Sequence, residues 1–134
     1  MGMNNPSIGY NSVTEFMGSG LPWVISATAG TAVTSYQFDK ISKRIIVKNH
    51  HATAAMRVGF TENGIGGVGG NYYFIVSAGE TFEFDSRIKQ IFIKRDASTD
   101  VTFSMFVELV GIDATMMPQL TGSVAGTTFW NGVG

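Results

Sequence analysis

Residues 101–112 read VTFSMFVELVGI, and apolar and polar side chains alternate along most of this stretch. The apolar set is Val101, Phe103, Met105, Val107 and Leu109, and the polar set between them is Thr102, Ser104 and Glu108. Successive side chains of a β-strand point to opposite faces of the sheet. The alternation therefore predicts a strand with one face in a core.

Short runs of the same kind recur along the chain at roughly 8 to 12 residue spacing, as is typical of sandwiches and barrels. No window shows a convincing helical period of 3.6 residues. The predicted strands are residues 23–28, 33–38, 44–49, 55–60, 72–76, 81–87, 90–94 and 101–112. We predict an all-β fold, an eight-stranded antiparallel β-sandwich of the single jelly-roll type with extended N- and C-terminal arms. The expected domains are an N-terminal arm (1–22), the jelly roll (23–112) and a C-terminal arm (113–134).

Charge is scarce in this chain and unevenly distributed. Charged residues make up 14% of the 134 residues, against roughly 25% in typical soluble domains. The formal net charge is −1, which argues against direct binding of nucleic acid. Cysteine is absent, so thiol chemistry and disulfides are excluded. We see neither a membrane-spanning stretch nor a signal peptide, and we expect synthesis in the cytoplasm without a membrane anchor.

The two ends of the chain are nearly uncharged, yet they contain large aromatic side chains. Residues 1–38 carry one charge, Glu15, and residues 114–134 carry none. Solvated tails are normally charged and poor in aromatic residues. We therefore expect the arms to dock on neighbouring subunits through the aromatic residues Phe16, Trp23, Phe129 and Trp130.

The stretch ENGIGGVGGNYYFIV, residues 62–76, contains a G-x-G-x-x-G pattern at Gly64, Gly66 and Gly69. In a dinucleotide site a helix must begin there, so that its N-terminal N–H groups face the pyrophosphate. Here a run of strand-forming residues follows and leaves no room for a long helix. We interpret the stretch as a long flexible connection between two strands, with no cofactor site.

No combination of residues predicts catalysis or metal binding. His50 and His51 are adjacent, so on a strand they would point to opposite faces, and no third histidine is present. Two acids and two bases share one predicted strand face that should neutralise itself: Glu83, Asp85, Arg87 and Lys89. No G-x-S-x-G elbow accompanies the serines. Tyr72, Tyr73 and Phe74 could stack a sugar or a base, although alternation turns at least one of them inward.

One block of sequence resembles a known family. It comprises RVGFTENGIGGVGGNYYFIVSAGETFEFDSRIKQIFIKRD (57–96), VTFSMFVELVGI (101–112) and a late LTGS (120–123). Its turns and core positions resemble the single jelly-roll penton proteins at the fivefold vertices of large icosahedral DNA viruses of eukaryotes. The resemblance covers roughly residues 33–123.

The resemblance implies a structural capsid protein rather than an enzyme. It implies a homo-oligomer, expected to be a pentamer, that contacts neighbouring major and minor capsid proteins in the virion after synthesis in the host cytoplasm. The alternative is a jelly-roll carbohydrate-binding or host-attachment module, which would use Tyr72 or Tyr73 with Glu62, Asn63 and Asn71. A signalling trimer of the tumour-necrosis-factor type is a third class, but it would require secretion.

Overall fold

The computed structural model describes residues 21–67 and 70–116. Every predicted strand is present, with ends that differ by a few residues. The strands are β1 (Leu21–Ala29), β2 (Thr34–Gln37), β3 (Lys40–Asn49), β4 (Met56–Gly59), β5 (Phe74–Val76), β6 (Thr81–Phe84), β7 (Gln90–Arg95) and β8 (Val101–Asp113). A short helix, α1 (Glu62–Gly66), and a 3-10 turn, Ala114–Met116, complete the described elements.

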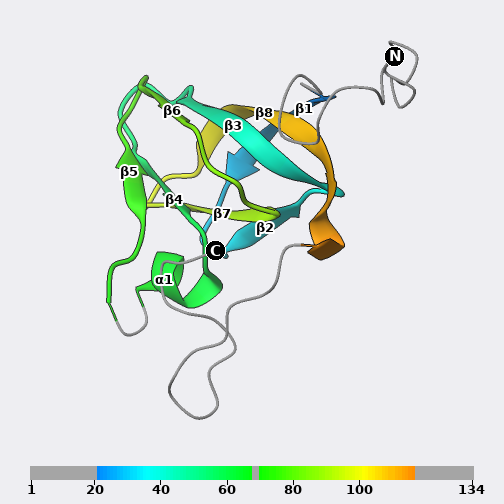
Figure 1. Ribbon diagram of the computed structural model, residues 1–134. Coiled ribbons are helices and arrows are strands. Elements are labelled where there is room, and N and C mark those ends of the chain that lie inside the picture. The colour runs from blue at the N-terminus through cyan, green and yellow to red at the C-terminus, as the bar shows by residue number, and fades with distance from the viewer. Residues whose placement is uncertain (1–20, 68–69, 117–134) are drawn as a thin grey trace, which may run out of the picture.

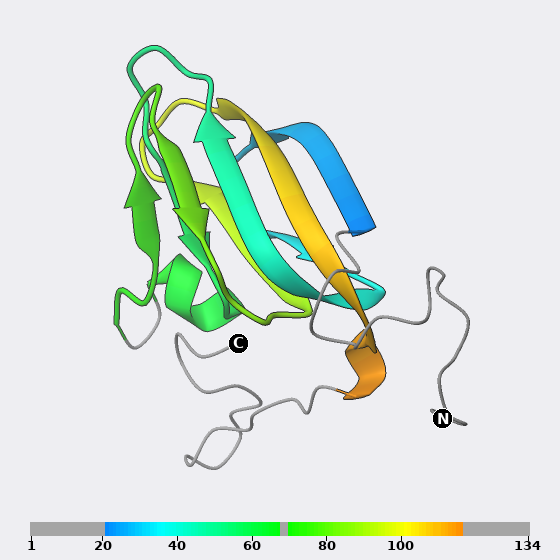
Figure 2. The ribbon, with the colours of Figure 1, turned by 45° about the horizontal axis from the view of Figure 1, so that its top comes forward.

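The strands form two four-stranded antiparallel sheets that pack face to face (Figures 1 and 2). Sheet A has the order β1-β8-β3-β6, and sheet B has the order β2-β7-β4-β5. Four pairings, β1 with β8, β2 with β7, β3 with β6 and β4 with β5, are nested like the rungs of one long hairpin. The pairings of β3 with β8 and of β4 with β7 then roll this hairpin into the two sheets. This is jelly-roll topology, so the predicted fold class is confirmed.

The limits of the sandwich differ slightly from those expected. β1 begins at Leu21 rather than after residue 22, and β8 continues to Asp113. The backbone N–H of Ala114 then donates to the carbonyl of Asp39, so the first residues of the predicted C-terminal arm belong to the domain. The rest of both predicted arms lies outside the described residues.

The core lies between the sheets and follows the predicted alternation of β8. Val101, Phe103, Met105, Val107 and Leu109 are all buried in the core cluster. Their neighbours in the cluster include Ile45 and Val47 from β3 and Ile91 and Ile93 from β7. Phe92 lies between Ile91 and Ile93 in β7 and is also buried, although outside the inter-sheet cluster.

Aromatic side chains fill the two open sides of the sandwich. Trp23 of β1 makes edge-on contacts with Tyr36 and Phe38, at ring-centroid distances of 6.3 and 5.0 Å. Burial among these rings raises the pKa of the Tyr36 hydroxyl. On the opposite side Phe74 of β5 stacks on Phe82 of β6 at 4.0 Å. These contacts join the edge strands of the two sheets.

The glycine-rich stretch connects β4 to β5, as predicted, but its first part is helical rather than a purely flexible connection. Thr61 caps α1, and its side chain accepts a hydrogen bond from the N–H of Gly64 at 3.1 Å. Gly67 ends the helix at φ 82°, in the left-handed region that glycine tolerates best. The helix spans five residues, too few to show a periodic pattern in the sequence.

Arg57 of β4 fastens this connection to sheet B. Its guanidinium donates to the carbonyl of Ile65 at 3.1 Å and lies 4.3 Å from the centre of the Tyr73 ring. Its Nε atom also donates to Asp96 at 2.8 Å. Ile65 is fully buried and approaches Gly59, where a Cβ atom would lie 3.3 Å from that of Ile65. Because Gly59 has no side chain, α1 can pack this closely against β4.

Gly64 and Gly66 provide a matched test of this packing. A Cβ atom at Gly64 would lie 2.5 Å from the Thr61 hydroxyl oxygen and 2.9 Å from Tyr72 Cβ, whereas one at Gly66 meets nothing within 4 Å. We expect Gly64→Ala to reduce the free energy of unfolding by about 1–3 kcal/mol through overpacking. Gly66→Ala should change it by less than about 1 kcal/mol, in the stabilising direction. Urea melts of both variants would measure the difference, and equal stabilities would contradict the described position of α1.

Candidate functional site

A bulge in β3 places two consecutive basic residues on the outer face of sheet A. Ser42 pairs with Leu109 and Arg44 pairs with the adjacent Glu108, so Lys43 is an extra residue in β3. The bulge shifts the alternation: Ser42 is fully buried, Lys43 is exposed, and Arg44 is half-buried. An uninterrupted strand would have placed Lys43 and Arg44 on opposite faces.

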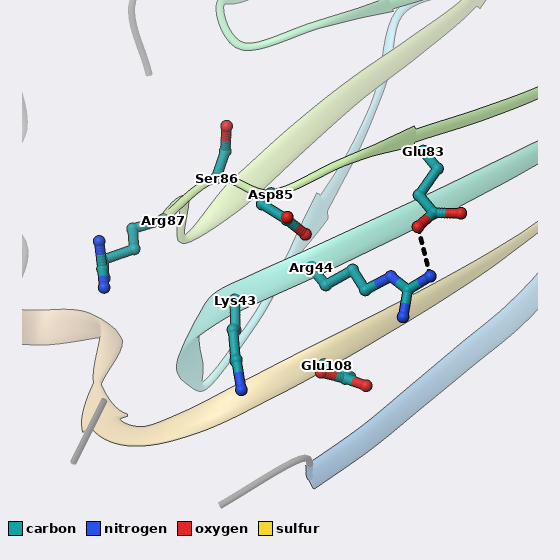
Figure 3. Close-up of a pocket in the computed structure, with 7 residues that line it drawn as sticks. All are labelled: Lys43, Arg44, Glu83, Asp85, Ser86, Arg87 and Glu108. Atoms are coloured by element: carbon teal, nitrogen blue, oxygen red, sulfur yellow. Dashed lines mark hydrogen bonds and ion pairs between the residues drawn. The ribbon is translucent and has the colours of Figure 1, made fainter. Parts of the chain in front are cut away.

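These two residues line a hollow of about 440 Å³ (Figure 3). Arg44 forms an ion pair with Glu83 of β6 across the hollow. The remaining lining residues come from β8 and from the connection after β6: Glu108, Asp85, Ser86 and Arg87. The hollow therefore carries three basic and three acidic side chains over β3, β6 and β8.

Ser42 is buried beneath the hollow and holds the connection from β6 to β7, which forms one of its walls. Its hydroxyl donates to the carbonyl of Ser86 at 2.6 Å and accepts from the N–H of Ile88 at 2.9 Å. The Ser42 N–H also donates to the Ile88 carbonyl at 3.0 Å. The connection from β6 to β7 is thus tied to the bulge. Sequence analysis missed this residue because the strand was expected to begin at Arg44; a serine at an inward-facing position was the available signal.

The chemistry of the hollow suits binding of polar groups better than catalysis. A carboxyl pair that acts as acid and base needs one group held neutral by an apolar surrounding. Here the carboxylates share the hollow with three cations, and the side chains of Arg44 and Glu83 are 40% and 49% exposed. Such an exposed pair contributes roughly 0–1 kcal/mol to stability.

The predicted charge row along one strand is only partly correct. β6 ends at Phe84, yet Asp85 and Arg87 beyond it are exposed like Glu83 and line the same hollow, whereas Lys89 is half-buried. Glu83 lies on the outer face as expected, but its ion-pair partner, Arg44, belongs to the neighbouring strand β3. The opposite charges therefore neutralise each other between neighbouring strands, because β3 and β6 pair there.

His50 and His51 engage different parts of the structure. His51 Nδ1 accepts hydrogen bonds from the backbone N–H groups of Thr53 and Ala54, at 3.0 and 2.9 Å, and so stabilises the turn before β4. His50 Nε2 lies 2.8 Å from the Ser104 hydroxyl. Within the described ranges no group of three or more His, Cys, Asp or Glu side chains is arranged to hold a metal ion.

The Ser104–His50 contact has the composition of a nucleophile and a base, and it was not predicted. Ser104 also shares a hydrogen bond with Ser26 at 2.8 Å, and all three residues lie on the exposed outer side of sheet A. A nucleophilic serine needs a base that is itself oriented, together with donors for the oxyanion. Among the described residues the His50 side chain makes this contact alone, so no second side chain orients the base.

The residues of the carbohydrate alternative lie around the glycine-rich connection. Tyr72 is 47% exposed, whereas one face of the Tyr73 ring is covered by Arg57. Both rings line a hollow of about 180 Å³ with Val58, Gly59, Phe60 and Phe74. Glu62 and Asn63 belong to α1, and Asn71 is exposed. Of the two tyrosines, Tyr72 therefore offers the accessible ring.

Of the four predicted interface residues, the structure describes Trp23. Its ring is half-buried and packs on Tyr36 and Phe38 of its own domain. This intramolecular packing accounts for the tryptophan at that position. Phe16, Phe129 and Trp130 lie outside the described residues, and their interface role stays a prediction.

Exposed apolar residues mark two opposite sides of the sandwich, which sequence analysis did not predict. On one side Val24 of β1 is 69% exposed. It continues an apolar row across the outer face of sheet A, because it pairs with Phe106, which pairs with Ile46. On the other side Phe74 and Ile75 of β5 are 52% and 44% exposed. Alternation alone could not have separated them from core residues, since each is apolar and in a strand.

No protein-family model matches the chain, and no curated protein matches it in sequence. Among solved structures, the Yersinia pseudotuberculosis-derived mitogen is similar with a TM-score of 0.38 and 11% sequence identity, over 67% of this chain and 86% of that one. So weak a likeness has no bearing on function. No helix in the described part of the chain is long and apolar enough to cross a membrane.

Ser42 tests how the charged hollow is held together. Ser42→Ala should lower the free energy of unfolding by about 1–3 kcal/mol, because the buried N–H of Ile88 loses its acceptor and the Ser86 carbonyl loses its donor. Ser26→Ala, which removes an exposed hydroxyl, should cost less than about 0.5 kcal/mol and is the control. Chemical denaturation of both variants measures this. A Ser42→Ala variant as stable as wild type would show that the tether contributes nothing.

Proposed function

We propose that this chain is a structural capsid subunit, a single jelly-roll protein that assembles with copies of itself through the sides of its sandwich. The resemblance in residues 57–96 and 101–112 to penton proteins is one support. The jelly-roll order of the strands is a second, because that fold is common among capsid proteins. As fold does not imply function, the surface must supply the main argument.

The observation that carries the proposal is where charge is missing on the folded domain. Residues 16–38 contain no charged residue, and this range includes all of β1 and β2, the edge strands of one side. Residues 63–79 contain none either, and they include β5, an edge strand of the opposite side. The hollow on sheet A carries six charged side chains. The other edge strand on that second side, β6, carries Glu83. Uncharged edge strands with exposed apolar residues are typical of surfaces that meet other protein.

The particular assembly proposed is a pentamer that caps an icosahedral vertex. Five copies around one axis would contact the neighbouring major and minor capsid proteins with the surfaces left outside the ring. The protein would reside in the virion after synthesis in the host cytoplasm. No cofactor, metal, nucleic acid or membrane takes part in this proposal.

Measurement of the assembled mass tests the proposal directly. For the full-length chain, native mass spectrometry should give five copies of the 14.4-kDa chain, about 72 kDa. Removing residues 117–134, after the last described residue, should leave a cooperatively melting domain that assembles less well. A full-length protein that stays monomeric at every concentration would contradict the proposal. Unchanged assembly of the truncated chain would remove the C-terminal arm from the interface.

The carbohydrate-binding alternative has one observation in its favour, the hollow beside the exposed Tyr72 ring. Aromatic rings of this kind stack on sugars in many binding sites. A glycan array would separate the two proposals. Saturable binding that is lost in Tyr72→Ala, by a protein that remains monomeric, would favour the alternative; an assembled protein without glycan signal would favour the capsid subunit.

A further inference from the structure

Apart from Pro22 near its start, the longest edge strand of the sandwich has none of the features that normally protect an edge. β1 extends over nine residues, pairs with β8 without any shift of register, and carries no charge. Among the described strands β8 is its sole neighbour, so no described strand pairs with the other edge of β1. Natural proteins usually protect such edges with charges, bulges or short strands.

The other edge strands of the described domain are protected because they are short. β2, β5 and β6 extend over four, three and four residues, and β6 carries Glu83. β5 nevertheless exposes apolar side chains, together with Tyr72 just before it. We refer to Tyr72, Phe74 and Ile75 as the β5 patch and to Leu21–Ala29 as the β1 edge. β1 and β5 lie at opposite sides of the sandwich in both views (Figures 1 and 2).

Resting on the proposed function, we infer that the β1 edge of one copy docks against the β5 patch of the next copy. The occupant of each surface is therefore a second copy of this chain. Both surfaces are apolar and uncharged, so the contact brings no charge into an apolar interface. The Val24 side chain of one copy and the Ile75 side chain of the other, 69% and 44% exposed in the single chain, would be covered in this contact.

The placement of the two surfaces favours this pairing over contacts between identical surfaces. A twofold dimer through the β1 edges would leave both β5 patches exposed, and the reverse dimer would leave both β1 edges unpaired. A head-to-tail contact uses both surfaces of every copy with one type of interface. When the rotation between copies closes, the product is a ring in which neither surface remains exposed.

Two charge substitutions, one on each surface, test the inference in the full-length chain. Val24→Lys disables the β1 edge and Ile75→Lys disables the β5 patch, both at positions where the wild-type side chain is exposed. Thr53→Lys adds a charge at an exposed position in the connection before β4 and is the control. Circular dichroism melts establish that each variant is folded. Ser26→Lys and Tyr72→Glu form a second pair on the same two surfaces.

Sedimentation and native mass spectrometry should find each single variant monomeric under conditions in which wild type and Thr53→Lys assemble. An equimolar mixture of Val24→Lys and Ile75→Lys should form a heterodimer and nothing larger, because one intact copy of each surface remains and the two lysines repel each other in the second contact. Homodimers of either variant alone, rings formed by either variant, or a mixture without heterodimer would each overturn the inference while assembly of wild type still stands. A monomeric wild type would instead overturn the proposed function.

Discussion

Every strand of the domain belongs to one long antiparallel ladder, made of the four nested strand pairs. The chain turns back between β4 and β5 at the closed end of this ladder, and β1 and β8 form its open end. Each nested pair satisfies the backbone hydrogen bonds on one edge of its strands. The ladder becomes two sheets because the other edges of β8 and β7 pair with β3 and β4, respectively. The inward faces of these four strands then form the core around Phe103 and Ile45. Leu21 and Leu109 pair near the open end of the ladder, so both ends of the domain leave it from the same region.

The closed end of the ladder explains the glycine-rich stretch better than a phosphate site does. The chain must turn from β4 into β5 while it covers sheet B, and α1 achieves this with Ile65 packed over Gly59. Thr61 and Gly67 cap the helix, and Arg57 donates to the carbonyl of Ile65. The glycines here allow close packing and one left-handed backbone conformation. A phosphate-binding G-x-G-x-x-G turn uses glycine for the same two reasons, so the pattern alone cannot distinguish the two cases.

Rolling the ladder also decides where polar and apolar surfaces lie. The bulge at Lys43 directs two basic residues outward, and Ser42 anchors the opposite wall, so charge gathers over β3, β6 and β8. Three of the four edge strands, β1, β2 and β5, have uncharged sequences, and the fourth, β6, carries Glu83 of the hollow. Stacked and edge-on rings such as Phe74 on Phe82 fill these sides without covering them fully. A subunit that meets its copies at the sides and presents charge on a sheet face is consistent with this separation.

The sequence by itself determined the number of strands, their faces and the class of fold, because alternation along Val101–Leu109 and the turn residues between runs are local signals. It also excluded thiol chemistry and located the uncharged segments. Three features depended on tertiary structure: the extra residue Lys43 in β3, the one-turn helix α1, and the proximity of His50 to Ser104. The helix α1 has local caps at Thr61 and Gly67 but is too short to show a periodic pattern. The extra residue in β3 and the His50–Ser104 contact result from pairing between residues far apart in the chain, which no local pattern encodes. The exposure of Val24 and Phe74 is of the same kind, because whether an apolar strand residue is buried depends on which strand lies beside it, and at the edges of these two sheets no further strand of the described domain does.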